Sequence, residues 1–215
     1  MYAIFWPAIF RISRISNILS FMLNEILKNK QIILASGSPR RQEFFKDLHI
    51  PFVIDVRPVT EVYPKHLKGT EITDYLAKLK ADAFKDLTND QILITSDTIV
   101  SNDGIAMGKP KNTSEAKQMI ASLSGKTHSV ETSVCFTTAK DQKVVHSSTK
   151  VTFKKLSEEE IDFYVTHYKP FDKAGGYAIQ EWIGFIGITH IEGSYFNVVG
   201  LPTHLVYNTL TALIT

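Results

Sequence analysis

Short apolar runs and stretches of helical periodicity alternate along most of this chain. The apolar runs have the length of buried strands, and they lie at 31–35, 51–56, 91–100, 128–138 and 143–154. Apolar residues at helical spacing predict helices at 39–48, 70–87, 113–123, 157–168 and 202–213. Because hairpins interrupt the alternation of strands and helices, the pattern favours an α/β fold with a mixed sheet.

Local signals predict where several helices begin and where the chain is irregular. Thr70 or Thr73 is the expected N-cap of the second helix, because both hydroxyls suit that position. Ser157 and Glu160 have the spacing of a capping box and predict the start of another helix. The glycine-containing stretch 169–180 is expected to be irregular.

Composition narrows the function classes. The chain has 215 residues, 44% of them hydrophobic, which is enough for a sizeable core in one large domain or two tightly joined lobes. The net charge of +2 does not indicate a nucleic-acid-binding surface. The single cysteine, Cys135, excludes an intrachain disulfide, and its apolar neighbours predict a core position. His128, His190 and His204 lack metal-ligand spacing and are interpreted as structural or surface residues.

The first 21 residues are apolar and aromatic, with Arg11 and Arg14 in the middle. These arginines fit neither a signal peptide nor a membrane-spanning helix, so no membrane partner is expected. An organelle presequence is an alternative, because no acidic residue precedes Glu25. We interpret residues 1–21 as an extension and expect residues 22–215 to form a single domain in the cytoplasm.

The sequence ILASGSPRR at 33–41 is the first candidate for chemistry. It predicts a strand, a tight turn and the first turn of a helix. Such a junction offers free backbone N–H groups, the hydroxyls of Ser36 and Ser38, and the guanidinium groups of Arg40 and Arg41. Arginine at a helix N-terminus opposes the helix dipole, so the pair indicates a bound anion, although a solvated basic helix start is the alternative.

Asp97 is a lone acid that follows the apolar residues 92–94. Strand ends open onto ligand crevices in α/β sheets, where a carboxylate binds a metal, activates a water or caps a turn. The neighbours of Asp97 alone do not decide among these roles. Four further polar residues are equally unspecific by themselves: Glu61, Lys80, Lys109 and Gln180.

Six stretches follow one another at suitable spacing over nearly all of residues 31–210. They are LASGSPRR (34–41), SDTIV (96–100), GKP (108–110), LSGKTH (123–128), DKAGGYAIQ (172–180) and GSYFNVVGLP (193–202). Any one of them is a weak signal, but in this order they resemble the Maf family of nucleoside triphosphate pyrophosphatases. The resemblance implies a fold like that of inosine triphosphate pyrophosphatases, with an elongated mixed sheet and two lobes around a central nucleotide cleft.

The resemblance also implies hydrolysis of a nucleoside triphosphate to the monophosphate and pyrophosphate, with Mg or Mn. The segment that ends at Gln180 is similar to that of the branch acting on dTTP and UTP. By the same match, Asp97 is the proton acceptor, and Arg40, Thr98 and Gln180 are positions that set substrate specificity. Modified pyrimidine nucleotides are a further substrate class that this match leaves open.

The chain departs from the family pattern at two positions. Ser96 precedes the acid where alanine or glycine is common, and Glu181 follows Gln180 where glycine is common. Neither departure removes a functional group. Glu181, however, is expected to change the loop that sets specificity.

The resulting hypothesis places a triphosphate across the turn at 36–41. Four cations would neutralise it: Arg40, Arg41, Lys80 and Lys109. Glu61 and Asp97 would hold the divalent metal ion, and Asp97 would deprotonate the attacking water. The alternative is a nucleotide-binding regulator of cell division without significant turnover, which would not need Asp97. A homodimer is expected from base rates alone.

Overall fold

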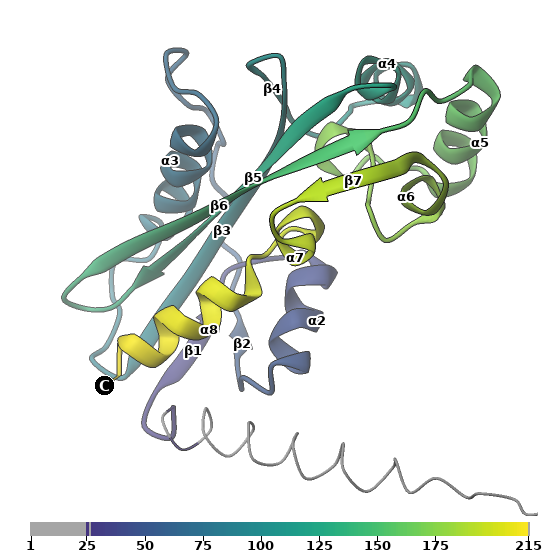
Figure 1. Cartoon of the computed structure of the whole chain (residues 1–215). Helices are drawn as coiled ribbons and strands as arrows, with labels where there is room; N and C mark the ends of the chain where they lie inside the picture. Colours follow the sequence, from purple (N-terminus) through teal and green to yellow (C-terminus); the bar gives the residue numbers. More distant parts are fainter. Residues whose placement is uncertain (1–24, 26, 215) are drawn as a thin grey trace, which may run out of the picture.

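The computed structural model describes Glu25 and residues 27–214, so the interpretation of residues 1–21 lies outside the described residues (Figure 1). The strands are β1 (Gln31–Leu34), β2 (Val53–Ile54), β3 (Gln91–Asn102), β4 (Ile105–Met107), β5 (Thr127–Thr137), β6 (Gln142–Phe153) and β7 (Ile188–Glu192). The α-helices are α2 (Pro39–Asp47), α3 (Thr70–Ala81), α4 (Thr113–Leu123), α5 (Glu158–Tyr168), α6 (Trp182–Gly187), α7 (Tyr195–Val199) and α8 (Thr203–Ala212). A short 3-10 turn, η1, covers Ala174–Gly176.

The strands of the described residues form one mixed sheet. Their order is β2-β1-β3-β5-β6-β7, and β4 pairs with β3. β1 is parallel to β2 and β3, whereas the other pairs are antiparallel. The mixed α/β class predicted from the sequence is therefore confirmed.

Strand β3 has a gap along one edge. Residues 91–94 pair with β1, and residues 100–102 pair with β4. Between them, residues 95–99 have no strand partner on that edge among the described residues, because β1 ends at Leu34 and the chain turns away. The opposite edge of the same residues pairs continuously with β5. Strand β3 is therefore held firmly here on one side, while on the other it is open to side chains from other elements.

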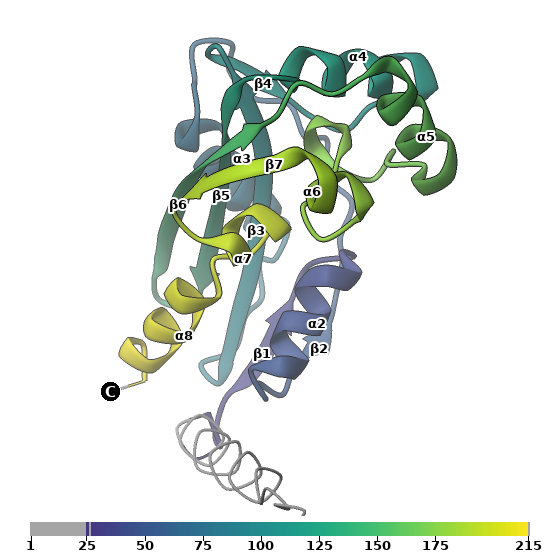
Figure 2. The same cartoon turned by 45° about the vertical axis from the view of Figure 1, so that its right-hand side comes forward.

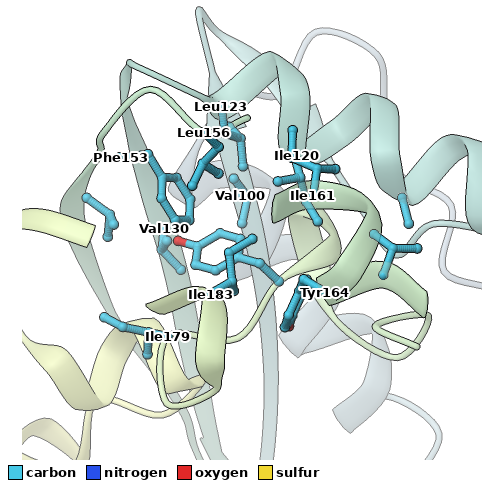
Figure 3. Packing of buried hydrophobic residues seen from close by; sticks show 14 residues of the cluster. Val100, Ile120, Leu123, Val130, Phe153, Leu156, Ile161, Tyr164, Ile179 and Ile183 are labelled. Atoms are coloured by element: carbon cyan, nitrogen blue, oxygen red, sulfur yellow. The ribbon is translucent and has the colours of Figure 1, made fainter. Parts of the chain in front are cut away.

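Helices cover both faces of the sheet (Figures 1 and 2). α3 packs on one face of β3, β5 and β6, and α7 packs on β5 and β6 from the other. With β1, α2 and α8 enclose an apolar core that includes Phe45 and Leu210. At the other end of the sheet, α4, α5 and α6 enclose a second core around Phe153, Tyr164 and Ile183 (Figure 3). Two smaller clusters, around Ala77 and Ile72, lie between α3 and the sheet.

The helix α3 differs from its prediction at both ends. It ends earlier than predicted, because the chain turns after Ala81 and buries Phe84. Its N-cap is Gly69, with a φ of 51°, and the prediction of Thr70 or Thr73 is wrong. Glycine adopts this backbone conformation without steric cost. The hydroxyl of Thr73 faces the sheet instead and contributes to the packing of α3.

The start of α5 confirms the predicted capping box. The Ser157 hydroxyl accepts from the Glu160 N–H, and the Glu160 carboxylate accepts from the Ser157 N–H. The stretch 169–180 is irregular apart from η1, as predicted. In the part of the chain that the structure describes, no helix has the length and apolar character needed to cross a membrane.

Candidate active site

A cleft of about 280 Å³ opens at the gap in β3, between α2 and the segment 172–180. Nine of the residues predicted for the site line it: Ser38, Arg40, Arg41, Glu61, Lys80, Asp97, Thr98, Lys109 and Gln180. Ser36 lines an adjoining hollow of about 350 Å³ that shares the cations of the cleft. The fold therefore brings together side chains that are as far apart in sequence as 36 and 180.

Asp97 projects from the open part of β3 toward α3. Its side chain is 10% exposed, and its Oδ1 accepts a hydrogen bond of 2.6 Å from the Lys80 ammonium. The same ammonium lies 3.2 Å from Oε1 of Glu61, which comes from the loop before α3. Burial raises the pKa of Asp97, against the charge and hydrogen bond of Lys80. A carboxylate whose pKa is raised is a stronger proton acceptor than an ordinary one.

The carboxylates of Asp97 and Glu61 are the candidate metal ligands of the cleft. No group of three or more His, Cys, Asp or Glu side chains that could hold a metal occurs among the described residues. Mg²⁺, however, is usually bound by one or two carboxylates together with substrate phosphates and water. Asp97 and Glu61 contact the same ammonium, so both carboxylates face one part of the cleft, and carboxylate oxygens are a ligand type that fits Mg²⁺.

Thr98 faces the opposite side of β3 from Asp97, because side chains alternate along a strand. Its hydroxyl accepts a hydrogen bond of 2.9 Å from Nη2 of Arg41. Arg41 also donates from Nη1 to the Ser96 carbonyl and from Nε to the Gly200 carbonyl, each at 2.9 Å. Its guanidinium thus supplies a donor to one backbone group, the Ser96 carbonyl, on the part of β3 that lacks a strand partner. Much of the hydrogen-bonding capacity of Arg41 is engaged within the protein.

Arg40 and Lys109 have fewer partners. Nη1 of Arg40 lies 3.3 Å from Oδ2 of Asp172, and the Arg40 side chain is 28% exposed. Within the described residues, the ammonium of Lys109 has neither an ion pair nor a hydrogen bond. The Ser36 hydroxyl accepts from the Ser38 N–H at 3.3 Å, and the Ser38 hydroxyl does not cap α2. This side of the cleft therefore keeps cations and hydroxyls available for a polyanion.

Gln180 lies at the other side of the cleft, directly after the buried residues Tyr177 to Ile179. Its Oε1 is buried and has no hydrogen-bond partner among the described residues. A buried acceptor without a donor is unfavourable by about 1–3 kcal/mol. Oε1 of Gln180 is therefore suited to accept an N–H from a bound ligand.

Sequence reasoning assigned no role to two charged residues at this side, Asp172 and Lys173, and it singled out Glu181 only for its expected effect on the loop that sets specificity. Lys173 is 8% exposed, and its ammonium lies 2.7 Å from Asp172 and 3.3 Å from Glu181. The sequence does show a lysine and two acids within one glycine-rich segment. It does not show that the lysine is buried, which is what makes the pairing important.

The residues interpreted as structural do not line the cleft. His128 is buried, and its Nε2 lies 2.7 Å from the Tyr177 hydroxyl. Burial lowers the pKa of His128 to about 4, so its ring is neutral near neutral pH. Cys135 is buried in the core, and burial raises the pKa of its thiol. His190 and His204 lie at the surface, as expected.

The cleft thus combines the open edge of β3, a buried acid and several cations, of which only Lys109 is exposed rather than partly buried. The chain belongs to the Maf family, because the family model described as Maf-like protein matches residues 31–213. Over 194 residues it is 66% identical to a dTTP/UTP pyrophosphatase of Christiangramia forsetii, which covers 90% of this chain and 99% of that protein.

A second relative, a dTTP/UTP pyrophosphatase of Flavobacterium johnsoniae, is 57% identical over 194 residues, covering 90% of this chain and all of that protein (100%). Among solved structures, a HAM1 protein from Coxiella burnetii matches with a TM-score of 0.47 and 15% identity. That match covers 85% of this chain and 99% of the other.

Proposed function

We propose that this protein hydrolyses nucleoside triphosphates, dTTP and UTP above all, to the nucleoside monophosphate and pyrophosphate. The observation that carries the proposal is the buried Asp97, held by Lys80 in a cleft whose other wall presents Arg40 and Lys109. The two relatives described above are both named dTTP/UTP pyrophosphatase, which supports the same reaction and substrates.

In this proposal the triphosphate lies along the turn 36–41. Arg40 and Lys109 neutralise its charge, and the hydroxyls of Ser36 and Ser38 donate to phosphate oxygens. Arg41 donates hydrogen bonds at the open edge of β3 and to the Gly200 carbonyl, and it adds its positive charge to the site. Positioning and charge neutralisation supply most of the catalysis in reactions of this type.

Asp97 accepts a proton from a water that attacks the α-phosphorus. The new bond joins the water oxygen to the α-phosphorus, and the bond between that phosphorus and the bridging oxygen to the β-phosphate breaks. Pyrophosphate leaves with the electron pair. Lys80 orients the Asp97 carboxylate through the 2.6 Å hydrogen bond and balances the charges of Asp97 and Glu61.

Glu61 and Asp97 are the residues that would hold a divalent ion, Mg or Mn. When bound, such an ion supplies positive charge beside the phosphate oxygens. We further propose that the protein acts in the cytoplasm on small-molecule nucleotides, without a nucleic-acid or membrane partner. We also propose that residues 22–215 work as one domain and that the protein is a homodimer.

Gln180 and Thr98 are proposed to set the preference for the base. Uracil and thymine present an N–H between two carbonyl oxygens. This N–H can donate a hydrogen bond to the buried Oε1 of Gln180, which has no other donor among the described residues. Cytosine has an acceptor at the corresponding ring nitrogen. Thr98 contributes a hydroxyl to the lining of the same cleft.

Pyrophosphate release from a panel of triphosphates with Mg²⁺ tests this function. The panel contains dTTP, UTP, CTP, GTP and ATP, together with 5-methyl-UTP and pseudo-UTP for the modified pyrimidines. Release from dTTP and UTP well above GTP and ATP supports the proposal. Binding of nucleotides without release from any of them would identify the protein as a nucleotide-binding regulator instead.

A further inference from the structure

A polar network joins the segment around Gln180 to the rest of the cleft, and its centre lies outside the residues that are proposed to act on phosphate. The carboxylate of Glu181 is its centre. Its Oε2 accepts a hydrogen bond of 2.5 Å from the Tyr164 hydroxyl, and its Oε1 lies 3.3 Å from the ammonium of Lys173. Tyr164 is completely buried and belongs to the core beneath this segment (Figure 3).

This network holds the backbone on both sides of Gln180. The Tyr164 hydroxyl accepts a hydrogen bond of 3.1 Å from the Ala178 N–H while it donates to Glu181. The Glu181 N–H in turn donates to the Ala178 carbonyl at 3.1 Å. Residues 178 and 181 are therefore fixed to one hydroxyl group, and Gln180 lies between them. Its own Oε1 makes no hydrogen bond among the described residues that could set its direction.

The network extends to the phosphate side of the cleft. Lys173 joins Glu181 to Asp172, and Asp172 contacts Arg40 at 3.3 Å. Burial opposes ionisation of Asp172, but the hydrogen bond and charge of Lys173, with the charge of Arg40, outweigh it and lower the pKa of the carboxyl. A continuous row of alternating charges thus links the residue proposed to contact the triphosphate with the segment proposed to contact the base.

Two charges in this row, those of Lys173 and Glu181, are poorly exposed, which makes each of them important to the other, whereas the Asp172 side chain is 60% exposed. The side chain of Lys173 is 9% exposed and that of Glu181 is 23% exposed. Burial, and then the hydrogen bond and charge of Glu181, raise the pKa of Tyr164, so its hydroxyl remains a donor. Loss of the Glu181 carboxylate would leave the Tyr164 hydroxyl without its acceptor and Lys173 without one of its two carboxylates.

We infer that Glu181 is a positioning residue for base selection: it holds Gln180 in the orientation that receives the pyrimidine. The inference rests on the proposed function, since it assigns Gln180 to the base. Glu181 lines neither hollow of the cleft, and no step of the reaction is assigned to it. Its effect should therefore fall on binding of the base and not on the chemical step.

The test compares UTP with inorganic tripolyphosphate, which has the same charged chain but no base. In Glu181→Ala we expect KM for UTP to rise about tenfold and kcat to change less than twofold, with Ki for tripolyphosphate unchanged. Glu181→Gln, which keeps an oxygen for the Tyr164 hydroxyl, should recover most of the loss. Glu192→Ala is the matched control, because Glu192 pairs with Lys150 at 3.3 Å on the surface.

Tyr164→Phe is the second variant, because it preserves the volume of the buried ring. It should raise KM for UTP in the same way, and combining it with Glu181→Ala should add less than the product of the two effects. Equal weakening of UTP and tripolyphosphate, or an unchanged KM for UTP in both variants, would overturn the inference.

Binding measurements can test the role of Glu181 even if the proposed reaction is wrong. If the wild-type protein releases no pyrophosphate from any triphosphate, the proposed reaction fails. Calorimetric Kd values for UTP and tripolyphosphate, measured on wild type and Glu181→Ala, still decide whether Glu181 positions the residue that binds the base. A selective loss of UTP affinity supports the inference, and a uniform change contradicts it.

Discussion

The two sides of the cleft are built in opposite ways. On the phosphate side, Arg40 is partly exposed with one carboxylate partner, and Lys109 has no partner within the described residues. On the base side, the segment 172–181 is largely buried and its charges are paired with one another. Available charge suits a flexible, highly charged triphosphate, whereas a firmly held segment suits discrimination between similar bases.

Asp97→Asn is expected to have the largest effect, because it removes the proposed proton acceptor while it keeps the shape of the side chain. We expect kcat to fall roughly 1,000-fold, within the range usual for a general base. The Kd for UTP should change little, since the phosphate and base contacts remain. Steady-state kinetics and calorimetry on the same preparation measure both. An Asp97→Asn protein with nearly full turnover would remove Asp97 from the mechanism.

Gly184→Ala tests how firmly the base side is held. A Cβ atom at this position would lie 1.8 Å from the carbonyl oxygen of Ile179, next to Gln180. Because the contact is with backbone, the segment must shift, and we expect the free energy of unfolding to fall by about 3 kcal/mol or more.

Urea unfolding of Gly184→Ala and of Gly37→Ala makes the comparison with the phosphate side direct. A Cβ at Gly37 meets no atom within 4 Å. Gly37→Ala should therefore remain within about 0.5 kcal/mol of wild type. If the two variants are equally stable, the base side is more adaptable than its packing indicates.

Two neighbouring arginines of the phosphate side should respond differently to truncation. Arg41→Ala removes the Arg41 hydrogen bonds from the Ser96 and Gly200 carbonyls and leaves Gly200 only the long bond from the Thr98 hydroxyl, so we expect a loss of about 3 kcal/mol in the free energy of unfolding. Arg40→Ala should cost less than about 1 kcal/mol, because its ion pair with Asp172 is partly exposed.

Kinetics complete this comparison. Arg40→Ala should raise KM for UTP and Ki for tripolyphosphate together, because the proposed contact is to phosphate. Similar losses of stability in the two variants would show that Arg41 does not support the open edge of β3.

The base side should also respond to pH through His128, which contacts Tyr177 beneath it. The pKa of His128 is about 4 in the folded protein and 6.5 in the unfolded chain. The unfolded chain therefore binds the proton more tightly, and the stabilisation is complete above pH 6.5 and is lost as the pH falls toward 4. Between pH 7.5 and 5 the expected loss is about 2 kcal/mol.

His128→Gln isolates this contribution, because an amide does not titrate and can still pair with the Tyr177 hydroxyl. Urea unfolding at pH 7.5 and pH 5 should show a smaller loss in the variant than in wild type. Carboxyl groups that titrate in this range affect both proteins alike. An identical loss in both would assign the pH dependence to groups other than His128.

Most of the candidate site residues lie in short motifs, and the structure places the candidates around one cleft and the hollow beside it. Asp97 and Lys109 lie in short stretches with a local pattern of strand and turn. Glu61 and Lys80 lie in no such pattern and in none of the six stretches, and they entered the hypothesis only as charges suited to a metal ion and a triphosphate. Lys80 contacts both Glu61 and Asp97, and these contacts depend on how α3 and the loop before it pack against β3. Side-chain pairing across elements has no periodicity that a single sequence displays.

The sequence alone determined the features that depend on near neighbours: the strand and helix periods, the capping box at Ser157, and the turn before α2. These follow from backbone preferences and from contacts a few residues apart. Only the tertiary structure decided that β3 has a gap, that Arg41 fills it, and that Glu181 holds the segment around Gln180. Each of these three features depends on burial or on a contact between residues at least 15 positions apart. Burial and long-range contacts arise only when the whole chain packs.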